Sequence, residues 1–220
     1  MSDNQLIGLA EDFFQNSLDS SPTSAIMRGH KKYFDQIEEL TEDQFQKEKE
    51  TVDNFIQRLN AIEKDNLTSR EQVTHGMLEF ALSSNQDSLL DRSWEFGAGV
   101  SGFTGFLIDY NQQMFVPDSE SADMMLKRLE LYKRLYTQIA EVQKEGLNNN
   151  RVATERNLLR TIDQLENYLA SSLDQDPLLL VNFSPEISGS EISGWKDKAK
   201  KIIEANIRPT VSAYLDQLKI

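Results

Sequence analysis

The sequence predicts an all-α protein, a bundle of about six to eight antiparallel helices with a glycine-rich connection in the middle of the chain. Apolar residues recur at three- and four-residue spacing over most of the 220 residues. These repeats open at capping residues and end at glycine or proline, as helices do. The run LLLV at residues 178–181 could form a short strand, but one strand makes no sheet. We expect a single helical domain over residues 1–220.

Capping residues open the helices of the first half. Thr41 with Gln44 starts one long helix, and Thr68 with Glu71 starts the next, which runs to about residue 91. Apolar residues follow on one helical face in each, and also in the N-terminal helix before them. The residues predicted to face inward are Leu6, Leu9, Ala10 and Phe13, then Phe45, Val52, Phe55, Ile56, Leu59 and Ile62, then Val73, Met77, Phe80 and Ala81.

A short helix is expected between the first two long ones. Ser21 followed by Pro22 is typical of a helix start, and Gly29 is typical of a helix end.

The second half carries three further helical repeats. One begins near Ser119 or Ser121 and ends at Gly146, before a turn over residues 148–150. The next ends at the Asp-Pro pair of residues 176–177. The residues predicted to face inward are Met125, Leu129, Tyr132, Tyr136 and Ile139 in the first of these helices, and Leu158, Ile162, Leu165, Leu169 and Leu173 in the second.

The last helix is predicted to begin near Trp195, after a loop over residues 185–194. Pro209 lies inside it and has no N–H for the carbonyl of Ala205, so we expect a kink there. The residues predicted to face inward are Ile203, Ile207, Val211, Tyr214 and Leu218.

The glycine-rich connection matches a nucleotide-binding pattern by letter only. Gly97, Gly99 and Gly102 spell G-x-G-x-x-G, which binds a dinucleotide when a strand precedes it and a helix opens on it. Here a helical repeat precedes the glycines, and the acids at the right distance, Asp118 and Glu120, lie at a helix start. We interpret the glycines as a turn or a close approach of the backbone to a neighbouring helix.

The composition excludes several classes of partner. There are 36 acidic and 23 basic residues, for a net charge of −13. Because phosphates are bound by clustered Lys and Arg, we expect no nucleic acid and no anionic membrane surface as partner. The chain has no apolar run of membrane-spanning length, and its first residues lack the pattern of a signal peptide, so we predict a cytoplasmic protein. The absence of cysteine excludes disulfides and thiolate chemistry.

No complete catalytic or metal motif occurs in the sequence. His75 shares a helical face with Glu71 and Glu79, which could be part of a metal site. The face lies opposite the predicted apolar stripe, so we interpret it as a solvated polar face. His30 directly after Gly29 is typical of a helix end. We expect no cofactor in this chain and leave its enzymatic activity open, since an enzyme that uses carboxylates alone would show no motif.

Three stretches in the same order resemble a large bacterial family, domain-of-unknown-function family 885 (DUF885). They are SPTSAIMRGHKKYFD at residues 21–35, FVPDSESADMMLKRLELY at 115–132, and the proline-containing WKDKAKKIIEANIRPTVSAYLDQL at 195–218. The pair Glu145-Gly146 also fits, whereas the residues 149–152 depart from the glycine and proline that the family commonly shows there. The resemblance covers the whole chain but only the N-terminal half of the family's usual length.

The resemblance implies part of a peptidase without its catalytic centre. Members look like helical zinc metallopeptidases, with a His-Glu-x-x-His helix in their second half. Zinc is therefore implied only for that missing half, and no family catalytic residue maps onto this sequence. The implied role is a scaffold that walls one side of a substrate channel, with Arg28, His30, Tyr33 and Asp35 as candidate lining residues.

Two functional hypotheses follow. In the first, the chain is the non-catalytic N-terminal half of a metallopeptidase, with an apolar face that packs on the missing half or, without it, forms a homodimer. In the second, it is a free-standing helical domain that binds a protein partner through that face. The sequence stops in the last turn of an apolar helix, at Ile220, which favours the first.

Overall fold

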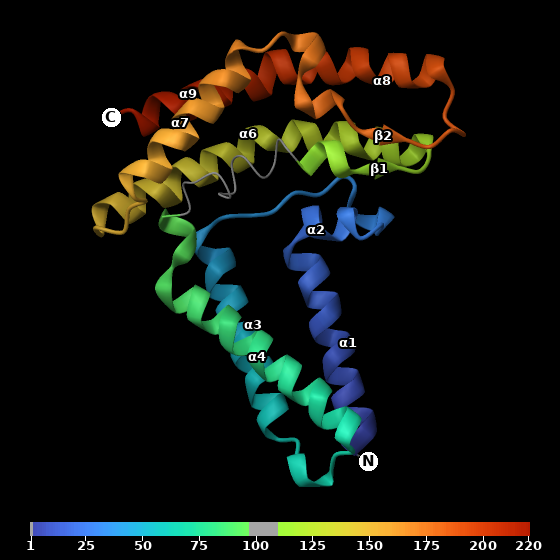
Figure 1. Cartoon of the computed structure of the whole chain (residues 1–220), viewed down its shortest axis with the longest axis vertical. Coiled ribbons are helices and arrows are strands. Elements are labelled where there is room, and N and C mark those ends of the chain that lie inside the picture. The colour runs from blue at the N-terminus through green and yellow to red at the C-terminus, as the bar shows by residue number, and fades with distance from the viewer. Residues whose placement is uncertain (1, 97–109) are drawn as a thin grey trace. The chain divides into compact units, whose positions relative to one another are not determined.

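The computed structural model describes residues 2–96 and 110–220, and among these the prediction of an all-α protein is confirmed (Figure 1). The α-helices are α1 (Ser2–Ser20), α2 (Pro22–Met27), α3 (Glu42–Asn60), α4 (Ser69–Asp91), α6 (Ser119–Asn148), α7 (Glu155–Ala170), α8 (Gly189–Ile202) and α9 (Arg208–Leu218). The glycine motif at residues 97–102 lies outside the described residues. None of the helices that the structure describes offers a membrane-spanning length of apolar residues.

The chain forms two compact units, and each is built from two stretches of sequence. Unit 1 consists of Met1–Ser20 and Leu40–Ser93, and unit 2 consists of Ser21–Glu39 and Trp94–Ile220. Residues 21–39 therefore leave the helices on either side of them in the sequence and join the second half of the chain. The expectation of one helical domain stays a prediction.

Unit 1 is a cluster of the helices α1, α3 and α4. The N-caps predicted for two of them are confirmed: the Thr41 hydroxyl accepts a bond from Gln44 N at 3.2 Å, and Thr68 with Glu71 forms a capping box. The predicted inward faces of α1 and α3 are also confirmed. The buried core residues are Leu6, Leu9, Val52, Phe55, Leu59, Ile62, Leu67, Leu78 and Leu82.

The inward face predicted for α4 is wrong. The apolar residues expected inside are largely outside: Val73, Met77 and Phe80 are 63%, 69% and 76% exposed. Leu78 and Leu82 are buried instead, and pack against α1 and α3. Apolar residues occur on both sides of this helix, so its sequence offers two candidate faces and tertiary packing decides between them.

His75 is buried for the same reason, and the prediction of a solvated polar face around it is wrong. Its side chain is 2% exposed, and neither ring nitrogen has a hydrogen-bond partner among the described residues. The metal-site alternative gains no support, because no three His, Asp or Glu side chains of the described chain converge. No polar partner in the described part of the chain explains a histidine at this position.

Helix α6 is the centre of unit 2, and α8, α9 and the turn between them pack against it (Figure 1). The inward face predicted for α6 is confirmed: Met125, Leu129, Tyr132, Tyr136 and Ile139 are all buried. The face predicted for the last helix is also confirmed, since Ile203, Ile207, Val211 and Tyr214 are buried and Leu218 is half-buried.

Helix α8 begins at Gly189 rather than near Trp195. The Ser188 hydroxyl accepts a bond from Glu191 N at 3.3 Å, and the Glu191 carboxylate accepts one from Ser188 N at 3.0 Å. The sequence suggests a loop here because two glycines lie within the first turns, although it also contains this capping box. The second half of the predicted loop at residues 185–194 is therefore helical.

The chain accommodates Pro209 by a change of helix type. A π-helical turn covers Ile203–Ile207, and α9 starts at Arg208 with the proline in its first turn. Proline is tolerated in a first turn because the N–H that it lacks has no intrahelical partner there. The wider π turn takes up the missing hydrogen bond without ending the apolar stripe.

Two short strands, β1 (Phe115–Val116) and β2 (Asn182–Phe183), form a parallel pair that the sequence does not predict. Asn182 N donates to Met114 O at 3.0 Å, and Ser184 N donates to Val116 O at 2.9 Å. Strands of two residues are too short to show an alternation of apolar and polar residues. The pair ties the approach to α6 to the segment before α8.

A buried ion pair joins the end of α7 to the start of α9. The Asp176 carboxylate is fully buried and accepts bonds from Arg208 Nε at 3.1 Å and Nη2 at 3.0 Å. Arg208 Nη1 also donates to Ser171 O at 2.9 Å. Helix α7 ends at Ala170, earlier than the predicted end at residues 176–177, because this network holds the following residues in turns.

Arg128 of α6 joins residues 21–39 to unit 2. Its guanidinium is fully buried and donates to the Thr23 hydroxyl at 2.5 Å and to the carbonyl of Gln36. Thr23 in turn donates from its N–H and its hydroxyl to the buried carboxylate of Glu38, at 2.9 and 2.7 Å. A buried charge is stable only when it is paired and hydrogen-bonded, so the three side chains depend on one another.

Replacing Arg128 with methionine should destabilise unit 2 by about 3 kcal/mol, because two bonds to a charged donor are lost and the Glu38 carboxylate loses its neighbouring cation. Trp94 and Trp195 both belong to unit 2, so tryptophan fluorescence in a urea titration reports its unfolding. The matched control is Arg134→Met, about six residues further along the same helix. Arg134 is exposed and makes only a 3.4 Å bond to Ile37 O, so we expect a change within about 0.5 kcal/mol. Equal effects of the two substitutions would contradict the account.

A second contact between residues 21–39 and α6 lies at the first turn of that helix. Asp118 caps this helix by accepting a bond from Ser121 N at 2.9 Å, and its carboxylate also pairs with the ammonium of Lys31. Lys31 and Ser121 together lower the pKa of Asp118 from 3.8 to about 2. A lowered pKa means that the ionised form stabilises the fold above pH 3.8, and that this contribution is lost as the pH falls towards 2.

Substituting Lys31→Met should raise the pKa of Asp118 from about 2 towards its ordinary value of 3.8. The measurement is a carbon-13 NMR titration of the Asp118 carboxyl in both proteins. Lys32→Met, at the next residue, should leave the midpoint unchanged. A midpoint that Lys31→Met does not move would disprove the pairing.

Candidate functional site

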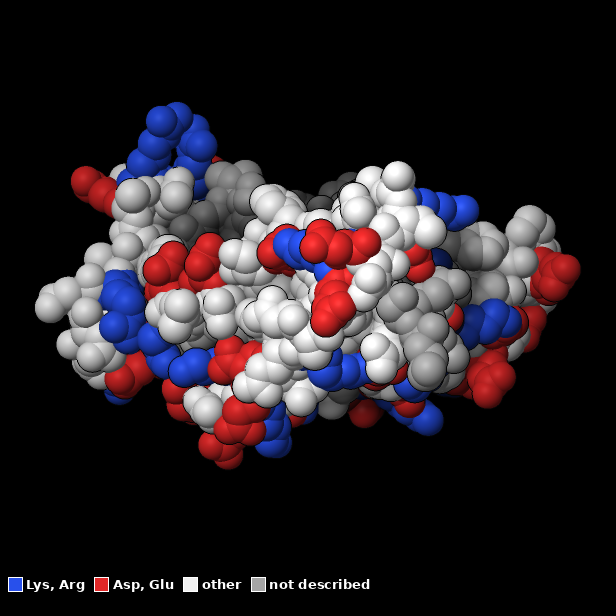
Figure 2. All heavy atoms as spheres, turned by 90° about the horizontal axis from the view of Figure 1, so that it is seen from below, with Lys and Arg blue, Asp and Glu red and all other residues white. Residues whose placement is uncertain are grey.

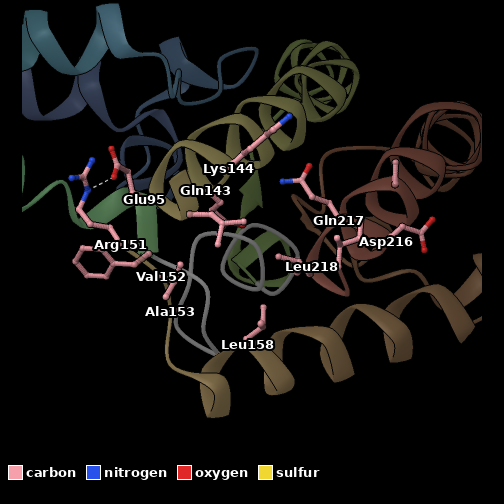
Figure 3. A pocket seen from close by; sticks show the side chains of 14 residues that line it. Glu95, Gln143, Lys144, Arg151, Val152, Ala153, Leu158, Asp216, Gln217 and Leu218 are labelled. Carbon is pink, nitrogen blue, oxygen red and sulfur yellow. Dashed lines mark hydrogen bonds and ion pairs between the residues drawn. The ribbon is translucent and has the colours of Figure 1, made fainter. Parts of the chain in front are cut away.

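An open concavity of about 670 Å³ lies in unit 2, between the C-terminal part of α6, the start of α7 and the end of α9 (Figure 3). Its size suits a small ligand or a few side chains of a peptide. Most of its described wall is apolar: Phe96, Leu147, Val152, Ala153, Leu158, Ala213, Leu218 and Ile220. The polar lining residues are Glu95, Gln143, Lys144, Arg151, Asp216 and Gln217.

An ion pair forms one edge of the concavity. Arg151 Nε donates to Oε2 of Glu95, whose side chain is fully buried, whereas the Arg151 side chain is 35% exposed (Figure 3). A buried carboxylate needs such a partner, because an unpaired charge in the interior is strongly unfavourable. The ion pair holds the segment before α7 against the turn that contains Glu95 and Phe96.

Gly146 allows this edge to form. A side chain at this position would place its Cβ 2.6 Å from Arg151 O and 2.8 Å from Glu95 O, closer than atoms approach. The predicted end of helix α6 at Gly146 is wrong, because the helix continues to Asn148. Asn150, with a φ of +56°, completes the turn that follows. Gly146 therefore permits the close approach of two backbones. The predicted turn over the asparagines is confirmed.

The amide side chains of the wall are used to hold α6 against α9. Gln143 Oε1 accepts a bond from the Tyr214 hydroxyl at 2.8 Å, and Gln217 Nε2 donates to Ala140 O at 2.9 Å. Burial raises the pKa of Tyr214, so the phenol stays neutral and remains a donor to Gln143.

No nucleophile and base come together among the described residues of the wall. The described part of the wall includes no histidine or serine, and its carboxylates are the ion-paired Glu95 and the exposed Asp216. Its described residues offer van der Waals contact beside an ion-paired edge.

The four lining residues predicted by resemblance lie elsewhere in unit 2, and none of them lines this concavity. Arg28 is exposed and caps the end of α2, and Gly29 after it has φ of +87°, which confirms the predicted helix end. The rings of His30 and Tyr33 meet edge to face, with centroids 6.5 Å apart. Tyr33 is 2% exposed, and Asp35 is half-buried. Their assignment to a substrate channel stays a prediction.

The sequence carried one signal for the concavity. Leu147 and Val152 are apolar residues that lie off the predicted inward stripes, and they are 65% and 57% exposed. Apolar residues outside a core stripe, close together in the sequence, indicate a surface used for contact. Their proximity to residues 213–220 and 95–96 depends on tertiary structure, which periodicity does not report.

These features define a helical protein with an apolar concavity and, in its described residues, no catalytic constellation. The chain belongs to the bacterial protein family of unknown function DUF885, whose model matches residues 22–219. The family membership that the three stretches indicated is therefore confirmed. No curated protein and no solved structure matches the chain.

Substituting Gly146→Ala should destabilise unit 2 by about 1–3 kcal/mol, because the two backbone carbonyls near its Cβ cannot move aside cheaply. The control is Gly194→Ala in α8, where a Cβ meets nothing within 4 Å. Alanine there should be neutral or stabilising by up to about 1 kcal/mol. Urea unfolding followed by tryptophan fluorescence measures both, and a neutral Gly146→Ala would show that the two segments do not approach closely.

Proposed function

We propose that this chain is the non-catalytic helical scaffold half of a metallopeptidase, and that it walls one side of the substrate channel. The observation that carries the proposal is the apolar concavity of unit 2. Its side chains Leu147 and Val152 are 65% and 57% exposed, which is costly in water unless another polypeptide packs on them.

The contribution of this chain would be positional. Apolar side chains of a peptide, or of the polypeptide that completes the channel, would fill the concavity and exclude water from it. Zinc does not fit the described residues, because no three ligand side chains converge, and no step of the proposal runs through a metal in this chain.

The alternative is a free-standing helical interaction domain that binds a protein partner through the same concavity. Both functions require an apolar contact surface. Neither calls for nucleic acid: on the face drawn in Figure 2, basic side chains are interspersed with acidic ones and gather in no single patch. The two functions differ in the length of the native polypeptide.

The scaffold function predicts that the native polypeptide is at least about twice as long as a chain of 25.2 kDa, beyond the size of one hydrophobic core. Immunoblotting and intact mass spectrometry of the protein expressed from its own gene measure this. The 220-residue chain alone should show no stoichiometric zinc and no hydrolysis of a mixed peptide substrate. A native mass of 25.2 kDa would replace the scaffold by the interaction domain, and zinc-dependent hydrolysis by this chain would contradict both.

The surface itself can be tested with the downstream polypeptide, expressed separately and added to this chain. Leu147→Lys should weaken its binding at least about tenfold, since a charge would enter an apolar contact. Leu159→Lys is the matched control: Leu159 is also an exposed leucine of unit 2, at 57%, but it does not line the concavity. Equal effects of the two substitutions would place the contact elsewhere.

A further inference from the structure

Helix α4 of unit 1 carries an apolar surface that the concavity of unit 2 does not explain. Val73, Met77 and Phe80 are 63%, 69% and 76% exposed, although the opposite side of the same helix packs into the core. One exposed apolar residue on a helix is ordinary, but three on one face form a contiguous stripe.

The stripe is the centre of a longer regular pattern. The exposed residues Arg70, Val73, Met77, Phe80, Ser84 and Asp87 follow one another at alternating spacings of three and four. This is the spacing of the seam of a two-stranded coiled coil, in which each helix presents one such line of residues to its partner. The seam has a cation at its N-terminal end, apolar residues in the middle and a carboxylate at its C-terminal end.

The pattern is complementary to itself when reversed. Its members lie symmetrically about the midpoint between Leu78 and Glu79, so two antiparallel copies of α4 would oppose each residue with a suitable partner. Met77 would face Phe80 of the second copy, and Val73 would face Ser84. At both ends Arg70 would face Asp87, and neither side chain makes an ion pair within the described part of this chain.

We propose that α4 is a homodimer interface, in which two copies of this chain pair their α4 helices antiparallel across a two-fold axis. The occupant of the stripe is a second copy because the end charges complement one another only in this arrangement, whereas a parallel pair would oppose Arg70 with Arg70. A two-fold interface uses the same patch on both subunits, and this patch matches itself. Gly76 beside the seam leaves open space around its Cα, so the partner helix can approach closely.

The dimer is expected to be weak and concentration-dependent. A standard stable interface buries about 800 Å² per partner, and one helical seam provides less. Two copies of a chain with a net charge of −13 also repel one another at low ionic strength. Salt should therefore strengthen the dimer at first by screening the net charge, although it also weakens the two end pairs.

Charge reversal tests the antiparallel pairing directly. Sedimentation velocity of the full chain over a range of concentrations gives the dissociation constant, and circular dichroism verifies the fold of each variant. Arg70→Glu and Asp87→Arg should each weaken the dimer about tenfold, because each opposes like charges at both ends of the seam. An equimolar mixture of the two variants should recover the wild-type constant, since in the mixed dimer one end pair is the native one and the other is restored with its charges exchanged.

Truncation tests the apolar centre. Phe80→Ser should weaken the dimer about 30-fold, as for a central aromatic residue of an interface. Leu90→Ser is the matched control: Leu90 is 62% exposed on the same helix but lies beyond Asp87, past the end of the seam, so its loss should change the constant less than about twofold.

Three results would overturn the proposal: a monomer at every concentration, a dimer that Phe80→Ser does not weaken, or a mixture of charge variants no tighter than either alone. Leu147→Lys, in unit 2, should leave the dimer unchanged. The outcome is therefore independent of the scaffold function.

Discussion

Unit 2 depends on the buried guanidinium of Arg128. This side chain lies in the middle of α6 and binds the Thr23 hydroxyl and the Gln36 carbonyl, from a segment about a hundred residues earlier. The Glu38 carboxylate, held by the N–H and the hydroxyl of Thr23, supplies the opposite charge nearby. Because an isolated charge is so unfavourable in an apolar interior, the cluster forms completely or not at all. It thereby assigns residues 21–39 to unit 2, although their sequence neighbours on both sides belong to unit 1.

Features that depend on local contacts can be predicted from the sequence, whereas features that depend on contacts between distant residues cannot. Helix starts with a side-chain cap, such as Thr68, and stripes with a single apolar face, as in α3 and α6, are local and were predicted correctly. Helix α4 has two apolar faces, and only contact with α1 and α3 selects the one that contains Leu78. The division into units and the concavity arise from residues far apart in the sequence, which no local pattern joins. Gly146 illustrates the limit of local patterns. The sequence suggests a helix end at this glycine, whereas the structure shows a close contact between two backbones.

Each unit presents an apolar surface in its described residues, and the two surfaces differ in kind. The concavity of unit 2 is lined by side chains from four segments and has an ion pair at its edge, which suits the side chains of another polypeptide. The seam of α4 is a single helical line with opposite charges at its ends, which suits an identical helix. Neither surface brings together a nucleophile, a base or a set of metal ligands among the described residues.

Native-state hydrogen exchange tests the central claim most directly, since it measures the free energy at which each amide opens. Residues 21–39 contain several bonded amides, among them Ala25, Gly29 and His30. If Arg128 ties this segment to unit 2, these amides should exchange with the same opening free energy and the same dependence on urea as the amides in the middle of α6. Exchange that instead follows α1 and α3 would show that the segment unfolds with unit 1, and would contradict the role given to Arg128.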